Sequence, residues 1–163
     1  MRRPEQVVIG LDLGSVSGWA ALTMAGSRVD GGQWQLGKGP PASRYIALRA
    51  SVLGLLERFD GWISAVAIET PTVAKQSTQA RRLGYGLLAT AELVVARRGL
   101  TLIECNNTQT KVALGGHGRA TKAEQISAAK RRWSVDVGEH EADALGVALF
   151  GLGVVKWTLA GLL

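Results

Sequence analysis

The stretch that decides the fold reads VVIGLDL, at residues 7–13. Its residues are apolar on both faces of the pleat until Asp12, and this pattern is typical of a central strand that is covered on both sides. Asp12 is the one charged residue of the run. The stretch therefore predicts a buried strand with a candidate functional side chain near its end.

Strand-like and helix-like stretches follow in a regular order. Strands are expected at residues 7–13, 19–23, 28–36, 65–69 and 100–104. Helices are expected at residues 43–59, between Ser77 and Gly99, from Thr121 to Trp133, and from Glu139 to at least Phe150. Residues 106–121 are polar and contain three glycines, which predicts a loop.

The predicted order βββαβαβαα indicates the fold class. Three consecutive strands, followed by alternating helices and strands, favour an α/β fold with a five-stranded mixed sheet and helices on both faces. No internal repeat or long linker divides the chain, so we expect a single domain over residues 1–163.

Composition limits the classes of function. The chain has 163 residues, a net charge of +6 and 47% hydrophobic residues, which predicts a folded domain with an affinity for polyanions. Cys105 is the only cysteine, so the chain has no intramolecular disulfide framework. The apolar stretch 142–163 contains Asp143 and Lys156, which favours a buried helix over a membrane span. A cytoplasmic protein without a membrane partner is expected.

Three carboxylates stand out because their surroundings are apolar. Asp12 and Glu69 each end a buried strand, and Asp143 lies near the start of the last helix among Ala and Leu. Carboxylates that converge in an apolar region repel one another unless a cation gathers them. Oxygen ligands of this kind are those that Mg²⁺ prefers. The pattern therefore predicts a metal site, although a single such residue can also be a turn or cap residue.

The last helix offers a fourth candidate ligand. Glu139 and His140 lie four and three residues before Asp143, on the same helical face, whereas Glu141 points elsewhere. His140 can bind a metal or transfer a proton near neutral pH. Glu139 can equally be a favourable charge at the helix N-terminus. Whether His140 or Glu139 completes the site stays open at this point.

The motifs around these residues resemble those of the RuvC-type Holliday-junction resolvases. They are Gly10-Leu11-Asp12-Leu13-Gly14-Ser15, Ala67-Ile68-Glu69 and Glu141-Ala142-Asp143-Ala144-Leu145. The pair Ala74-Lys75 and the basic stretch that contains Lys111 and Lys122 match as well, so the resemblance covers nearly the whole chain. The resemblance implies a ribonuclease H-like fold, in agreement with the predicted strand order.

The resemblance also implies a mechanism. Asp12, Glu69 and Asp143 would bind catalytic Mg²⁺, with Mn²⁺ as a substitute. His140 takes a position at which many members have Asp and some have His. The implied function is a Mg²⁺-dependent, structure-selective DNA endonuclease, which resolves four-way junctions by metal-activated attack of water on a phosphodiester. Bacterial or phage origin is expected for such a protein.

Basic residues supply candidates for DNA contact. The resemblance implies that Lys111 and Lys122 contact DNA near the scissile phosphate. The full set of candidates is Lys75, Arg81, Lys111, Arg119 and Lys122. Because a four-way junction presents paired equivalent phosphates, we expect a homodimer whose two sites cut opposite strands. No nucleotide cofactor is expected.

Other functions remain as alternatives. The run Asp-Leu-Gly-Ser, followed by Gly18, also resembles RNA-processing nucleases related to these resolvases. A non-catalytic junction-binding module, in which the acidic residues only satisfy turns and caps, would bind DNA without a metal. The first loop also resembles that of the sugar-kinase, actin and chaperone ATPase group. The chain is too short for the two lobes of that group.

Overall fold

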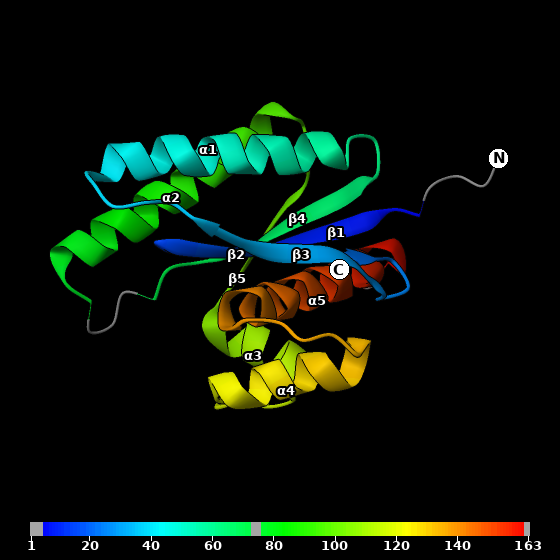
Figure 1. Cartoon of the computed structure of the whole chain (residues 1–163). Helices are drawn as coiled ribbons and strands as arrows, with labels where there is room; N and C mark the ends of the chain where they lie inside the picture. The colour runs from blue at the N-terminus through cyan, green and yellow to red at the C-terminus, as the bar shows by residue number, and fades with distance from the viewer. Residues whose placement is uncertain (1–4, 73–75, 162–163) are drawn as a thin grey trace.

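A five-stranded mixed sheet lies at the centre of the computed structural model, which describes residues 5–72 and 76–161 (Figure 1). The strands are β1 (Val7–Asp12), β2 (Val16–Thr23), β3 (Arg28–Gln35), β4 (Ile63–Glu69) and β5 (Leu102–Cys105). The helices are α1 (Pro41–Arg58), α2 (Thr78–Arg97), α3 (Asn107–Gly115), α4 (Lys122–Trp133) and α5 (Glu139–Leu159). Helices α1 and α2 cover one face, and α5, α3 and α4 lie on the other (Figure 1). The predicted α/β architecture is confirmed.

Strand β1 occupies the middle of the sheet, whose strand order is β3-β2-β1-β4-β5. It pairs antiparallel with β2 and parallel with β4. The outer pairs are β2 with β3, antiparallel, and β4 with β5, parallel. Leu11 pairs with Ile68, so the residues that follow them, Asp12 and Glu69, lie at the same edge of the sheet.

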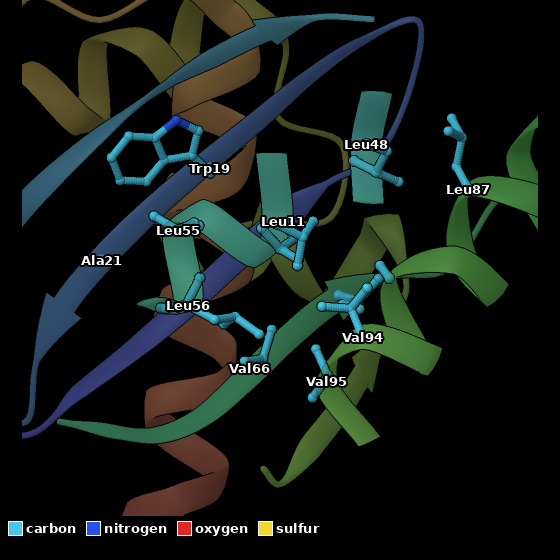
Figure 2. Packing of buried hydrophobic residues seen from close by; sticks show 14 of the residues in the cluster. Leu11, Trp19, Ala21, Leu48, Leu55, Leu56, Val66, Leu87, Val94 and Val95 are labelled. Atoms are coloured by element: carbon cyan, nitrogen blue, oxygen red, sulfur yellow. The ribbon is translucent and has the colours of Figure 1, made fainter. Parts of the chain in front are cut away.

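The face under α1 and α2 holds a core of large apolar side chains (Figure 2). Leu56 of α1 and Leu87 of α2 pack in the same cluster as Leu11 and Val66 of the sheet. Each of these four side chains is at most 1% exposed. Full burial of one such side chain stabilises the fold by about 1.5–3 kcal/mol. This face therefore supplies a large share of the stability.

The opposite face is packed with small residues. Ala20 of β2 lies buried against Ala144 and Ala148 of α5. A Cβ atom on Gly10 would overlap the backbone of Ala144 and of Ala148, so α5 crosses directly against the backbone of β1. By length and composition α5 could cross a bilayer, but it packs along β1, β2 and β4, the position of a core helix. The predicted buried helix is confirmed.

Helix α3 is the main departure from the predicted order. Its residues lie within 106–121, which were expected to form a loop, so the element order is βββαβαβααα. A capping box begins the helix: Asn106 accepts from the backbone N–H of Gln109, whose side chain accepts from the backbone of Asn106. Gly116 ends it in the left-handed conformation, with φ of 85°. The helix is short and buries only Thr110 fully, so its apolar pattern was too weak to reveal it.

Two other helices, α2 and α4, also begin with a side-chain cap. Ser77 accepts a hydrogen bond from the backbone N–H of Ala80, and Thr121 forms a capping box with Glu124. Strand β2 is longer than expected, and α5 continues to Leu159. Ile46 is one of the apolar residues at helical spacing that predict the helix at residues 43–59, but it is 70% exposed, because it lies on the outer face of α1.

Candidate active site

Two carboxylates end neighbouring parallel strands. Asp12 ends β1 and Glu69 ends β4, and both side chains are partly buried. Glu69 is fixed by two side chains of α3. Its Oε1 accepts from Asn107 Nδ2 at 3.2 Å, and its Oε2 accepts from Thr110 Oγ1 at 2.8 Å. These bonds set the orientation of the Glu69 carboxylate.

Helix α5 brings the third carboxylate and the histidine to this edge. The imidazole Nδ1 of His140 lies 3.7 Å from Asp12 Oδ2, and Asp143 follows one helical turn later. The approach depends on Gly18, which pairs with Asp12 across the β1–β2 ladder. A Cβ atom on Gly18 would overlap the backbone carbonyl of His140. A glycine opposite the first carboxylate thus lets the N-terminus of α5 reach the site.

The three carboxylates act on one another electrostatically. Burial, together with the charges of Asp12 and Glu69, raises the pKa of Asp143 to about 6. Burial and the charge of Asp12 also raise the pKa of Glu69, although its hydrogen bonds to Thr110 and Asn107 oppose the shift. Each shift reports an unfavourable cost of holding negative charge here. A bound cation would remove that cost.

The donor set fits a hard divalent cation. Three carboxylates and one imidazole offer the oxygen and nitrogen ligands that such ions use. Within residues 5–72 and 76–161, no three acidic, histidine or cysteine side chains are gathered closely enough to share one ion as they stand. Carboxylates that repel one another keep apart, so small side-chain movements would be needed to close the ligand set.

The two glutamates at the start of α5 each pair with a basic side chain, whereas His140 also reaches Asp12. Glu139 Oε2 lies 2.9 Å from Lys122 Nζ, and Glu141 Oε1 accepts from Arg28 at 2.6 Å. His140 lies between two carboxylates: its Nδ1 is 3.7 Å from Asp12 Oδ2, and its Nε2 is 3.4 Å from Glu139 Oε1. The interaction with Asp12 raises the pKa of the imidazole, while burial opposes the rise. Of the two candidates left open by the sequence, His140 is therefore the one beside a strand-end carboxylate.

Cys105 lies beside Glu69 but does not supply a nucleophile. It is buried, and its Sγ donates to the carbonyl of Ile68 at 3.4 Å. Burial, with the charges of Glu69 and Asp12, raises the pKa of the thiol to about 12. The thiol is therefore protonated at neutral pH, and its role is packing.

Two of the basic candidates lie near the carboxylates. Lys111 is on α3 and not on a loop, and its charge lowers the pKa of Glu69. Lys122 begins α4, and its hydrogen bond to Glu139, with the charges of Glu139, Asp143 and Asp12, raises its pKa. Exposed Arg81 and Arg119 are not among the charges that shift the pKa of Glu69 or of Asp143. The remaining candidate, Lys75, lies outside the described residues.

A cleft of about 250 Å³ adjoins the strand-end carboxylates. Asp12 and Glu69 form one wall, and Ala80 and Leu83 of α2 contribute to the other. A second groove, of about 400 Å³ between α3 and α5, includes Trp157 in its lining and has no charged residue. The acidic cleft, which is lined by Asp12 and Glu69 and not by His140 or Asp143, is therefore one side of the candidate active site.

The sequence did not reveal the side chains that hold Glu69. Asn107 and Thr110 belong to α3, which was expected to be a loop, so neither was a candidate. The pair Asn106 and Gln109, spaced as in a capping box, was the signal that could have located the helix. If the helix had been assigned from the sequence, Asn107 and Thr110 in its first turn would have been candidates for contact with Glu69 at the end of β4.

Known proteins with similar sequences carry one name. No family model matches the chain. The crossover junction endodeoxyribonuclease RuvC of Magnetococcus marinus is 31% identical over 157 residues, which cover 92% of this chain and 86% of that protein. The protein of the same name from Protochlamydia amoebophila is 27% identical, with 88% of each chain covered. The similarity therefore extends over most of the domain.

Solved structures agree with the sequence relatives. The Thermus thermophilus RuvC structure superposes with a TM-score of 0.75 at 26% identity, over 96% of this chain and 97% of that one. The T. thermophilus RuvC in complex with Holliday junction substrate gives 0.78 over 94% of this chain. A ROK family transcriptional regulator, at 11% identity and a TM-score of 0.52, shares only the fold. By the identity and coverage of these relatives, the chain belongs to the RuvC family of crossover junction endodeoxyribonucleases.

Proposed function

We propose that this protein is a divalent-metal-dependent DNA endonuclease that resolves four-way junctions. The observation that carries the proposal is the convergence of three carboxylates, from β1, β4 and α5, at one edge of the sheet in a chain of the RuvC family. A purely structural role does not explain it, because Asp143 and Glu69 are held at a cost in charge that capping residues do not carry.

Asp12, Glu69 and Asp143 would hold the metal, with His140 at the rim of the site. Mg²⁺ is the proposed ion, with Mn²⁺ as a substitute, and it supplies Lewis-acid activation of water and stabilisation of the leaving oxygen. Asn107 and Thr110 keep the Glu69 carboxylate in its orientation.

Proton transfer is the proposed task of His140. Its Nδ1 faces Asp12 at 3.7 Å, and the raised pKa of the imidazole suits a group that exchanges a proton near neutral pH. The reaction is attack of water on a phosphodiester, which leaves a 5′ phosphate and a 3′ hydroxyl. Lys111 and Lys122 lie close enough to the carboxylates to interact with them electrostatically. From these positions the two lysines would hold the scissile phosphate.

The proposed partner is branched DNA, bound by a homodimer. A relative of this fold was solved in complex with a Holliday junction substrate, and the net charge of +6 favours such a polyanion. A two-fold dimer of single-domain chains, each of residues 1–163, would present two sites to symmetric strands. The proposed DNA contacts beyond the site are Lys75, Arg81 and Arg119. A cytoplasmic bacterial location without a nucleotide cofactor fits this activity.

Cleavage of a synthetic four-way junction tests the proposal. Wild-type protein should cut the junction in Mg²⁺ and not in chelator, and Asp12→Asn should lose the activity by a factor on the order of 10³ or more, because a ligand of the reacting metal is gone. Lys156→Ala, at the far end of α5, is the matched control and should cut normally. Wild-type rates for Asp12→Asn would overturn the assignment.

Two further measurements separate the alternatives. Cleavage of a linear duplex and of a structured RNA, side by side with the junction, distinguishes a resolvase from an RNA-processing nuclease. Calorimetric titration of Mn²⁺ should show binding to the wild type and a much weaker signal for Asp143→Asn. Junction binding without any metal binding would instead support a non-catalytic module.

A further inference from the structure

Another groove, between α1 and α2, adjoins the acidic cleft and is lined by two arginines. It has a volume of about 480 Å³, lies between the N-terminal parts of α1 and α2, and is lined by Arg44 and Arg82 among others. Ala80 and Leu83 of α2 line both this groove and the cleft of Asp12 and Glu69. The two hollows are therefore neighbours along one path, with carboxylates at one end and guanidinium groups at the other.

Arg44 is held at this groove by one side-chain hydrogen bond to the described part of the chain. Its NH1 donates to the hydroxyl of Ser15 at 3.0 Å, and Ser15 lies in the turn that follows the strand of Asp12. A guanidinium has five N–H donors, and the Nε of Arg44 is buried without a hydrogen-bond partner. Among residues 5–72 and 76–161, no carboxylate lies within ion-pair distance of Arg44. Its charge is thus anchored to the turn after Asp12 and has no carboxylate partner among the described residues.

A contact between α1 and α2 joins the backbone of Arg82 to the residue that follows Arg44. The hydroxyl of Tyr45, the neighbour of Arg44, donates to the backbone carbonyl of Arg82 at 3.1 Å. The Tyr45 ring occupies space that a Cβ atom on Gly86 would overlap, so the glycine leaves room for this placement of the ring. Tyr45 and Gly86 therefore hold together the segments of α1 and α2 that carry Arg44 and Arg82.

We propose that Arg44, with Arg82, binds a backbone phosphate of the DNA strand that enters the active site. The inference rests on the proposed function and adds a phosphate subsite to it. A planar guanidinium suits the oxygens of a phosphodiester, which it can contact through two parallel hydrogen bonds. Such a contact positions the strand and reads no sequence. Ser15 ties this subsite to the turn after Asp12.

Junction binding by Arg44 variants tests the subsite. Fluorescence anisotropy in chelator, over a series of salt concentrations, gives both the affinity and its salt dependence. Arg44→Ala should weaken binding by on the order of tenfold, because a charge-assisted contact is lost. The slope of log affinity against log salt should fall by about one for each protein copy bound. Arg44→Lys should keep the slope and recover part of the affinity.

The matched control is Arg49→Ala, which removes the same charge from an exposed position of the same helix. It should change the affinity less than about twofold and leave the melting temperature unchanged. If Arg44→Ala behaves like Arg49→Ala in affinity and slope, the subsite is overturned. A lower melting temperature with an unchanged salt slope would also overturn it, because Arg44 would then only support the fold.

The outcome is distinguishable from failure of the proposed function. If the wild type cuts the junction in Mg²⁺ and Arg44→Ala loses only affinity and salt slope, both proposals stand. If the wild type binds but cuts no junction, the nuclease proposal fails, whereas the Arg44 comparison in chelator still decides the subsite. A wild type that cuts the junction, with Arg44→Ala equal to the control, removes the subsite alone.

Discussion

The two faces of the sheet are built from different side chains. Large residues such as Leu56 and Leu87 separate α1 and α2 from the strands, and this face contains the larger apolar cluster. Alanines and glycines line the face under α5, where Gly10 and Gly18 allow backbone contact with the helix. The face under α1 and α2 therefore contains the larger apolar cluster, and the face under α5 lets a helix pack directly against strand backbone.

The difference explains how the candidate site is assembled. A large side chain at Gly18 would hold the N-terminus of α5 away from the sheet, and His140 and Asp143 would then be too far from Asp12. Because backbone atoms of α5 fill the space beside Gly18, a change of rotamer cannot relieve the overlap with a larger side chain. Neighbouring side chains cannot absorb the overlap either. Proximity here depends on a few glycines, whereas stability on the other face depends on many leucines and valines.

Gly18→Val should have the largest effect on both stability and activity. The new side chain would overlap the carbonyl of His140, so α5 must move away from β2. We expect a loss of more than about 3 kcal/mol in the free energy of unfolding and no junction cleavage. Chemical denaturation followed by circular dichroism, with a cleavage assay at low temperature, measures both.

The control for this change is Gly54→Ala on α1, where a Cβ atom would have no neighbour within 4 Å. An alanine at an exposed helix position should stabilise the protein by about 0.5–1 kcal/mol and leave cleavage unchanged. A Gly18→Val protein as stable and as active as Gly54→Ala would show that close approach of α5 is not required.

Leu56→Ala tests the other face. The side chain is 1% exposed and lies in the large cluster, so its truncation should cost about 2–3 kcal/mol and leave a cavity. Leu56 does not line the acidic cleft, so the folded fraction should cut junctions at the normal rate. Ile46→Ala, an exposed position of the same helix, should change stability by less than about 0.5 kcal/mol. Loss of cleavage activity in a folded Leu56→Ala protein would contradict the division of roles between the two faces of the sheet.

Much of the fold and of the acidic set was predictable because the signals are local. Asp12 and Glu69 each end an apolar strand, and parallel neighbours bring such ends to one edge. His140 and Asp143 are spaced for one helical face. The α1–α2 core likewise follows from apolar residues at helical spacing, although Ile46 shows that the pattern does not identify every buried position.

The rest depended on tertiary contacts that spacing does not encode. The contrast between Glu139 and His140 depends on Lys122, which comes from α4 and pairs with Glu139. Gly18 has its role only because α5 packs on β2, far away in the sequence. Helix α3 is held by caps and by its packing on α5, not by a strong apolar stripe. The side chains that hold Glu69 were missed with it.

Asp143→Asn should stabilise the protein while it removes cleavage. The Asp143 carboxyl has a pKa of about 6 in the folded protein against 3.8 for the ordinary group, so the folded state binds more protons between these values. Stability therefore falls as pH rises from about 4 to about 6, and the full penalty is present above that window. After allowance for solvent screening, Asn should gain about 1–2 kcal/mol at pH 8 in chelator.

Thermal denaturation at pH 4 and pH 8 measures this gain. At the lower pH the wild type and Asp143→Asn should differ little, because the carboxyl is largely protonated in the folded state. Excess Mg²⁺ at pH 8 should raise the melting temperature of the wild type and not that of the variant, since ligand binding stabilises the native state. A variant less stable than the wild type at pH 8 in chelator would contradict the presence of a costly buried charge on the α5 face.

Glu139→Gln, at the first residue of α5, should have the smallest effect on stability and on cleavage. Glu139 is exposed, and its pairing with Lys122, by hydrogen bond and charge, lowers its pKa. Exposed ion pairs contribute little, so stability should be unchanged and cleavage should stay within about twofold of the wild type.

His140→Ala, one residue further along the helix, should slow cleavage on the order of 100-fold, as loss of a proton-transfer group does. Single-turnover rates of the two variants on one junction measure the contrast. If Glu139→Gln loses the activity and His140→Ala keeps it, the glutamate and not the histidine completes the site, and the side-chain arrangement around Asp12 must change when the metal binds.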